Sequence, residues 1–167
     1  MRFTTTRGPF DVQFVRAWAP HGADRVYYLV RNRYYDGVRF FRVVPGFVVQ
    51  FGIHPKPAVA EAWQNANIQD DPVNHPNAKG TVTFATGGPN TRTTQVFINL
   101  ADNSSLDAQG FAPFGRVTSG TATIAKLYSG YGEQPTSAQG EMVARGDAFI
   151  RQSFPKLDRI VTARVAG

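Results

Sequence analysis

One cation stands in an otherwise almost wholly apolar run of the sequence. In "FFRVVPGFVVQFG", residues 40–52, Arg42 and Gln50 lie eight residues apart on either side of Pro45-Gly46. An arginine stays charged at any ordinary pH and presents a rigid fork of N–H donors, and an apolar setting strengthens each hydrogen bond that it donates. Arg42 could therefore stabilise a polar group of a bound molecule, or it could simply carry its charge to the surface on its aliphatic stem.

Most other chemistries lack their residues. The chain has no cysteine, which excludes disulfides, thiolate ligands and a cysteine nucleophile. His21, His54 and His75 are far apart and form no HxxxH or HxH pair. "GGPNT" lacks the Lys-Ser/Thr of a phosphate loop, no GxSxG is present, and Ser104-Ser105 has no histidine nearby in sequence. We therefore expect no metal, no cofactor and no hydrolytic nucleophile.

The residues that remain suit a reaction that needs no acid, base or metal. Rotation about an X-Pro peptide bond is opposed by amide resonance, with a barrier of about 18–20 kcal/mol, so a catalyst must favour the twisted amide. A guanidinium that donates a hydrogen bond near the prolyl nitrogen or carbonyl would stabilise the twisted form more than the planar form, and an apolar pocket would hold the ring. Arg42 fits the first role.

Composition favours a single, mainly β domain over residues 1–167. The length is about that of one ordinary domain, and the hydrophobic share of 42% is close to normal globular usage. The counts of 16 glycines, 11 prolines and 13 phenylalanines indicate short, aromatic-rich strands joined by many turns. No repeat and no low-complexity linker divides the chain.

Hydrophobic patterns place the elements that must carry Arg42 and Gln50. Alternating or β-branched runs predict strands within 7–18, 38–47, 48–53, 80–86, 94–101, 114–120 and 159–165. Helical spacing of apolar residues predicts helices within 21–37, 121–130 and 137–154. Arg42 and Gln50 thus belong to adjacent strands joined by a turn at Pro45-Gly46. The proline-rich stretch 54–79 is expected to be a long surface loop, pinned to the body by Trp63.

Charge and hydropathy limit the partners. The net charge of +6 is spread along the chain without a basic block, so we expect no specific nucleic-acid binding, although a basic barrel that binds nucleic acid remains a weaker alternative. The N-terminus lacks the apolar region of a signal peptide, and no run approaches the roughly 18 apolar residues of a membrane span. A cytoplasmic location is expected for the chain as it stands, or a periplasmic or secreted one if a leader was removed.

Two blocks of the sequence closely resemble the cyclophilin family. "FFRVVPGFVVQFG" resembles the signature F-[HF]-R-[IV]-[IV]-P-[GD]-F-x-x-Q-x-G, and residues 80–120 resemble the family's G-x-[VIL]-[SA]-M-A-x-x-G-P-N-[ST]-x-x-[ST]-Q-F-F-I block with its L-D and F-G-x-V elements. Residues 22–43 also resemble the first helix and its approach in bacterial members. The resemblance implies a closed eight-stranded antiparallel β-barrel capped by α-helices. It also implies a peptidyl-prolyl cis-trans isomerase that assists folding by acting on unfolded or flexible proteins, without a cofactor.

The resemblance also implies the site residues. Arg42 matches the catalytic arginine, and Gln50 matches the glutamine that orients the substrate backbone. The positions that wall the proline pocket are Phe47, Val48, Phe97 and Leu106, with Phe111 at the rim. The positions that line the groove for the residues before proline are Ala85, Thr86, Gly87 and Gln95. For the phenylalanines the alternative is core filling, and for the groove glutamine it is a bond to a strand-end backbone group.

Several departures from the family pattern leave a second function open. Val48 replaces a common methionine, Thr86 a common asparagine and Phe111 a rim histidine, and one extra residue separates Leu106-Asp107 from Phe114-Gly115. These changes leave open the alternative that the protein is a proline-peptide binding or chaperone module with little catalytic turnover. The tryptophan that helps many members bind cyclosporin has no counterpart within 103–105, so weak cyclosporin binding is expected. We expect a monomer whose partners are proline-containing peptides and unfolded proteins.

Overall fold

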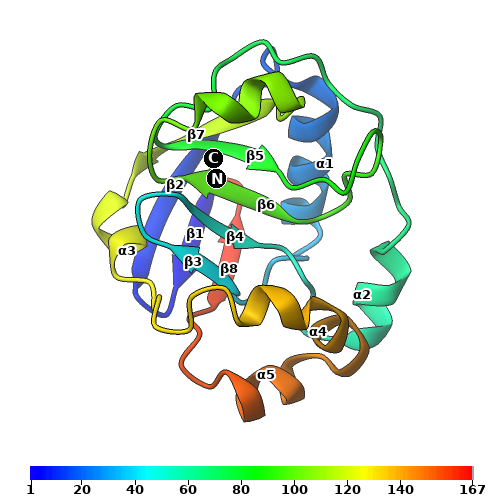
Figure 1. Ribbon diagram of the computed structural model, residues 1–167, viewed down its shortest axis with the longest axis vertical. Coiled ribbons are helices and arrows are strands. Elements are labelled where there is room, and N and C mark those ends of the chain that lie inside the picture. The colour runs from blue at the N-terminus through cyan, green and yellow to red at the C-terminus, as the bar shows by residue number, and fades with distance from the viewer. Residues whose placement is uncertain (167) are drawn as a thin grey trace.

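Eight antiparallel strands form one curled sheet in the computed structural model, which describes residues 1–166 (Figure 1). Their order across the sheet is β3-β4-β6-β5-β7-β2-β1-β8. The strands are β1 (Arg2–Thr5), β2 (Gly8–Phe14), β3 (Arg42–Val44), β4 (Val48–Phe51), β5 (Thr81–Phe84), β6 (Val96–Asn99), β7 (Pro113–Ser119) and β8 (Ile160–Arg164). The predicted mainly β, antiparallel class is confirmed, and the N-terminal strand β1 is an element that the sequence patterns missed.

The expectation of a closed barrel is wrong, because the strand ladder is open between β3 and β8. Only a few backbone hydrogen bonds cross this seam, and they come from the segment that precedes β3. Gly37 donates to the Ile160 carbonyl at 2.8 Å, Ile160 donates to Val38 at 2.8 Å, and Phe40 donates to Asp158 at 2.9 Å. β3 is only three residues long, so it forms a ladder with β4 alone and the sheet remains a half-barrel.

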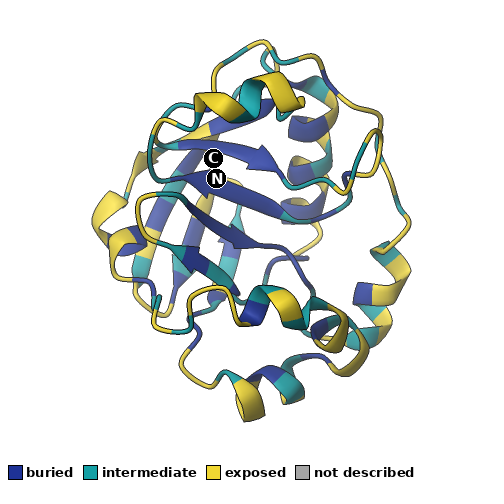
Figure 2. Ribbon diagram, in the orientation of Figure 1, coloured by how far each residue is buried: buried dark blue, intermediate teal, exposed yellow. Residues whose placement is uncertain are grey.

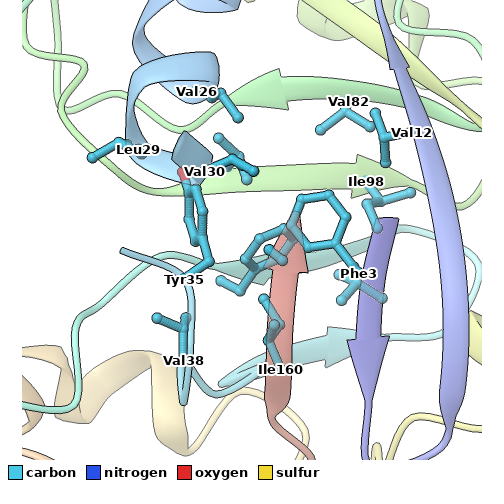
Figure 3. Packing of buried hydrophobic residues seen from close by; sticks show 14 of the residues in the cluster. Phe3, Val12, Val26, Leu29, Val30, Tyr35, Val38, Val82, Ile98 and Ile160 are labelled. Atoms are coloured by element: carbon cyan, nitrogen blue, oxygen red, sulfur yellow. The ribbon is translucent and has the colours of Figure 1, made fainter. Parts of the chain in front are cut away.

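The core lies inside the curl, where the strands are largely buried (Figure 2), and its side chains include many aromatic rings. Phe3 stacks on Phe10 with ring centroids 5.0 Å apart and meets Tyr35 and Phe51 edge to face. Figure 3 shows Phe3 and Tyr35 among aliphatic side chains from α1 and from several strands. Burying rings of this size is the largest apolar contribution to such a fold.

The longest helix, α1 (Pro20–Arg31), seals the core with one apolar face. Proline stands in its first turn, where no intrahelical N–H is needed, and its buried residues include Ala23, Val26, Leu29 and Val30. The other helices are α2 (Pro57–Trp63), α3 (Thr121–Ala125), α4 (Gln139–Arg145) and α5 (Asp147–Ser153), with short 3₁₀ turns at Ser104–Gln109 and Pro135–Ala138. No helix within residues 1–166 is both long enough and apolar enough to span a bilayer.

Two expectations about the helices need correction. The helix predicted within 137–154 is split into α4 and α5 at Gly146, whose φ of +69° favours glycine and breaks the helical path. The long connection 54–79 contains the helix α2, which its proline-rich sequence concealed. Trp63 ends α2 and packs against Tyr28 and Tyr34, with the Arg25 guanidinium 5.1 Å from its ring. The expectation that this tryptophan pins the connection to the body is confirmed.

Candidate active site

The alternation of side chains along β4 and β6 separates core from site. On β4, Val49 and Phe51 belong to the core inside the curl, so Val48 and Gln50 face the outer side. Gln50 is paired in register with Arg42 on β3 and with Phe97 on β6. Residues directly opposite each other in a sheet share one face, so these three side chains gather on the outer face of the sheet.

A hollow of about 190 Å³ opens on this face. It is lined by Arg42, Phe47, Val48, Gln50, Ala85, Thr86, Phe97, Leu106 and Phe111. All nine are residues that the sequence singled out. Phe97 meets Phe111 edge to face with centroids 5.7 Å apart, and Phe97 is only 5% exposed, so the floor is apolar and rigid.

Arg42 is held from three sides at this hollow. Its Nη1 donates to Gln50 Oε1 at 3.1 Å, and its guanidinium carbon lies 5.4 Å from the centre of the Phe47 ring. On the outer side, Nε and Nη2 donate to the two carboxylate oxygens of Glu133, both at 2.9 Å. The hydrogen bonds from Arg42, together with one from Thr136, lower the pKa of Glu133 below its usual range.

The sequence patterns missed Glu133. It lies 91 residues from Arg42, in a stretch between predicted helices that carries no regular hydrophobic pattern. It also lies outside both blocks that resemble the cyclophilin signature. A lone glutamate next to glycine gives no local sign of its partner, so only the folded chain shows the pair.

Amide side chains continue the polar network away from Arg42. Gln50 is 7% exposed and donates through Nε2 to Gln95 Oε1 at 2.9 Å. Gln95 donates in turn to Gln139 Oε1 at 3.2 Å. Gln50 therefore presents its oxygen to the guanidinium and its amide nitrogen to the second glutamine, which fixes the orientation of both groups.

A second hollow of about 260 Å³ adjoins the first. It shares Gln50, Ala85 and Thr86 with the first hollow, and it contains the two remaining predicted site residues, Gly87 and Gln95. The predicted site residues are therefore distributed over two adjoining hollows. Together these hollows form one groove along residues 85–87. The other residues of this second hollow are Thr91, Thr93 and Gln139.

The loop that carries residues 85–87 is braced by its own threonines. The Gly87 amide donates to Thr91 Oγ1 at 2.9 Å, and that hydroxyl donates to the Gly88 carbonyl at 2.8 Å. The side chain of Thr86 bonds to the same carbonyl. Thr86 thus uses its hydroxyl within the loop, which leaves its backbone at the groove wall.

The long connection 54–79 holds this loop from outside. Asp70 and Asn90 exchange hydrogen bonds, with the Asp70 amide 2.8 Å from Asn90 Oδ1 and the Asn90 amide 3.1 Å from Asp70 Oδ2. Beside them, Arg92 Nη1 lies 3.0 Å from Asp71 Oδ2 in a buried ion pair. The connection, whose role the sequence left open, therefore fixes the outer wall of the groove.

The lining of both hollows offers hydrogen bonds and apolar surface rather than acid–base groups. Arg42 is the only residue of either lining with an ionisable side chain. Within residues 1–166, no group of three or more His, Cys, Asp or Glu side chains is placed to hold a metal ion. Such a site can bind an apolar ring and donate fixed hydrogen bonds to a backbone amide.

The chain thus combines a curled antiparallel sheet with an arginine at the edge of an apolar hollow on its outer face. Residues 1–145 match the family described as "Cyclophilin type peptidyl-prolyl cis-trans isomerase/CLD", and this chain belongs to that family. Its activity is peptidyl-prolyl cis-trans isomerisation, and this finding favours a catalyst over the binding module with little turnover.

Relatives and solved structures agree with the family. A peptidyl-prolyl cis-trans isomerase of Acinetobacter baylyi is 33% identical over 142 residues, covering 81% of this chain and 73% of the relative. The cyclophilin AquaCyp293 of Hirschia baltica shares the fold with a TM-score of 0.70 at 16% identity, over 96% of this chain and 71% of that one. A Cryptosporidium parvum cyclophilin, crystallised in the presence of the dipeptide Ala-Pro, has a TM-score of 0.63 at 21% identity over 74% and 81% of the two chains.

Proposed function

We propose that Arg42 is the catalytic residue of the isomerase and that the 190 Å³ hollow receives the prolyl ring of its substrate. The observation that carries the proposal is the position of the guanidinium, which lies at the edge of an apolar hollow with its orientation fixed by neighbours. The substrates are X-Pro bonds in unfolded or flexible segments, and the biological role is assistance to folding.

The proposed mechanism acts on the amide itself. As the X-Pro bond twists, resonance is lost and the prolyl nitrogen gains lone-pair density, so a donor aimed at that nitrogen stabilises the twisted form more than the planar form. Arg42 is this donor. The apolar surroundings strengthen the interaction because they exclude competing water.

The rest of the groove binds the substrate. Phe47, Phe97 and Phe111 grip the pyrrolidine ring, and the 85–87 backbone pairs with the residue before proline. Gln50, held between Arg42 and Gln95, orients the substrate carbonyl. The Cryptosporidium parvum relative crystallised with Ala-Pro supports a proline-containing peptide as the ligand class.

Replacement of Arg42 by alanine tests the proposal most directly. We expect Arg42→Ala to lower kcat/KM for an Ala-Pro tetrapeptide by about 100-fold or more, because a donor used mainly in the transition state is lost. The measurement is a protease-independent isomerase assay. Arg16→Ala is the matched control, since Arg16 is exposed and pairs only with Asp24 on the surface. Full activity in Arg42→Ala would refute the assigned role.

Two further properties belong to the proposal. We expect weak cyclosporin binding, because Asn103, Ser104 and Ser105 occupy the stretch in which many members have a tryptophan. Asn103 donates hydrogen bonds to the Phe47 carbonyl at 3.0 Å and to Asn99 Oδ1 at 2.9 Å. Titration calorimetry with the drug measures this affinity. We also expect a monomer, which light scattering tests.

A further inference from the structure

One segment of the chain contains the residues at both ends of the polar network in the groove. The network runs from Glu133 through Arg42, Gln50 and Gln95 to Gln139, with successive distances of 2.9, 3.1, 2.9 and 3.2 Å. Glu133 and Gln139 belong to the stretch 133–139, which we call the return segment. None of its residues lies in the two motif blocks. The return segment therefore supplies both ends of a polar network whose other members belong to β3, to β4 and to the residue just before β6.

Glu133 occupies only part of the guanidinium. Its carboxylate takes the side of Arg42 that carries Nε and one N–H of Nη2, while Gln50 takes one N–H of Nη1. The second N–H of Nη1 and that of Nη2 are left for a substrate. A bidentate pair fixes the plane as well as the position of an arginine, so Glu133 determines where these free donors point.

The return segment is anchored well enough to act as a fixed support. Just before Glu133, Tyr131 packs edge to face against Phe154 at 5.2 Å, and its hydroxyl accepts a hydrogen bond from the Lys156 amide at 3.0 Å. Just after it, Pro135 is buried, and the Thr136 hydroxyl donates to Glu133 Oε1 at 3.0 Å. The carboxylate is thus held on both sides along the chain rather than extended freely into solvent.

The exposure of the pair argues against a purely structural purpose. The Arg42 side chain is 23% exposed and that of Glu133 is 56% exposed, and ion pairs this accessible add little to stability. An arginine side chain loses considerable rotamer entropy when it is held in one orientation, so a preformed partner lowers that cost at the moment of reaction.

We infer that Glu133 is a positioning residue that orients the Arg42 guanidinium for isomerisation. The inference rests on the proposed role of Arg42. An opposite role is also testable, because a carboxylate on Arg42 could instead occupy donors that the substrate needs. In that case removal of Glu133 would increase the activity.

The test compares Glu133→Gln with a matched control, Glu141→Gln. Both changes remove one carboxylate charge, but Glu141 forms only an exposed i,i+4 pair with Arg145. We expect Glu133→Gln to lower kcat for the Ala-Pro tetrapeptide by about 10- to 100-fold with KM changed by less than about threefold, because a misaimed donor weakens the transition state rather than substrate binding. The control should keep wild-type activity, and both variants should unfold at the wild-type temperature.

A double-variant cycle with Arg42→Ala separates this inference from the proposed function. If Glu133 acts through Arg42, adding Glu133→Gln to Arg42→Ala should cause no further loss. An equal loss from Glu133→Gln in both backgrounds, a rise in KM alone, or unchanged or increased activity would each overturn the inference while leaving the role of Arg42 intact. Full activity in Arg42→Ala would instead overturn the proposed function.

Discussion

Two arginine–carboxylate pairs in this protein differ in geometry and in surroundings, since Glu133 accepts two hydrogen bonds from Arg42 whereas Asp71 accepts one from Arg92. Arg42–Glu133 lies at the groove with side chains 23% and 56% exposed, whereas Arg92–Asp71 lies beside α1 with side chains 6% and 1% exposed. Their shortest N–O distances are 2.9 and 3.0 Å. The shortest distances are alike, so burial decides how much each pair contributes to stability. The exposed pair can direct a donor at a ligand, and the buried pair can only hold the fold.

The hydrogen-bond partners of Asp71 show how the buried pair stabilises the fold. Asp71 accepts hydrogen bonds from the amides of His21 and Gly22 at 3.0 and 2.9 Å, in the first turn of α1. An anion is favourable there because those amides have no partner within the helix. Arg92 adds a bond to the Gln69 carbonyl. One carboxylate thus joins α1, the 54–79 connection and the loop at the groove wall.

The largest expected effect comes from breaking the buried pair. Asp71→Ala should destabilise the protein by about 3–5 kcal/mol, because it removes the buried carboxylate that pairs with Arg92 and accepts hydrogen bonds from two amides of α1. Urea unfolding measures this change. Asp24→Ala, which removes the exposed partner of Arg16, is the matched control and should cost less than about 1 kcal/mol. Equal losses of unfolding free energy in Asp71→Ala and Asp24→Ala would contradict the conclusion that burial determines the contribution of a pair to stability.

A smaller effect, on isomerase activity, should appear when a fall in pH protonates Glu133 of the exposed pair. Hydrogen bonds from Arg42 lower the pKa of Glu133, so a fall in pH protonates Glu133 only below the usual glutamate range. Isomerase activity of the wild type should therefore drop as pH falls through this lowered pKa. Glu133→Gln should lack that acid limb.

A control must separate the titration of His54 from that of Glu133 in the pH dependence of activity. His54 lines a further hollow that also includes Gln95 and Gln139, and burial lowers its pKa. His54→Gln should keep the acid limb if Glu133 is its source. If the fall in activity at low pH disappeared in His54→Gln and persisted in Glu133→Gln, it would be assigned to the histidine.

The smallest expected effect is that of the exposed pair on stability. A carboxylate whose pKa is lowered in the folded state stabilises the fold above its unfolded pKa, and this contribution is lost as pH falls through the folded value. For a carboxylate as exposed as Glu133, the contribution is about 0–1 kcal/mol. Glu133→Gln should therefore shift the urea midpoint near neutral pH only slightly. A loss as large as that of Asp71→Ala would make Glu133 a structural residue.

Local patterns placed Arg42 and Gln50 on adjacent strands, and the resemblance to the cyclophilin family supplied the other expected site residues. The turn at Pro45-Gly46 joins two strands, and it brings Arg42 and Gln50 opposite each other. Alternation along β6 places Phe97 on the groove side and its neighbour Val96 in the core. Phe111 reaches the rim despite the extra residue before Phe114, a match that sequence spacing alone left uncertain.

Long-range pairings were beyond those patterns. The open seam between β3 and β8 depends on how far a three-residue strand can extend its ladder, and hydropathy does not encode that. The break at Gly146 interrupts a stretch whose apolar spacing is helical throughout. The second hollow also depends on the packing of α4, whose first residue, Gln139, accepts a hydrogen bond from Gln95.

The sequence by itself determined the strand faces and the turn at Pro45-Gly46, because side-chain alternation and turn chemistry act over a few residues. Its resemblance to the cyclophilin family indicated most of the side chains that line the groove. Only the tertiary structure decided which carboxylate pairs with which arginine. Glu133 and Asp71 lie in irregular segments, and their partners are 91 and 21 residues away. Burial, which depends on the whole fold, then determines which pair serves the site and which holds the chain.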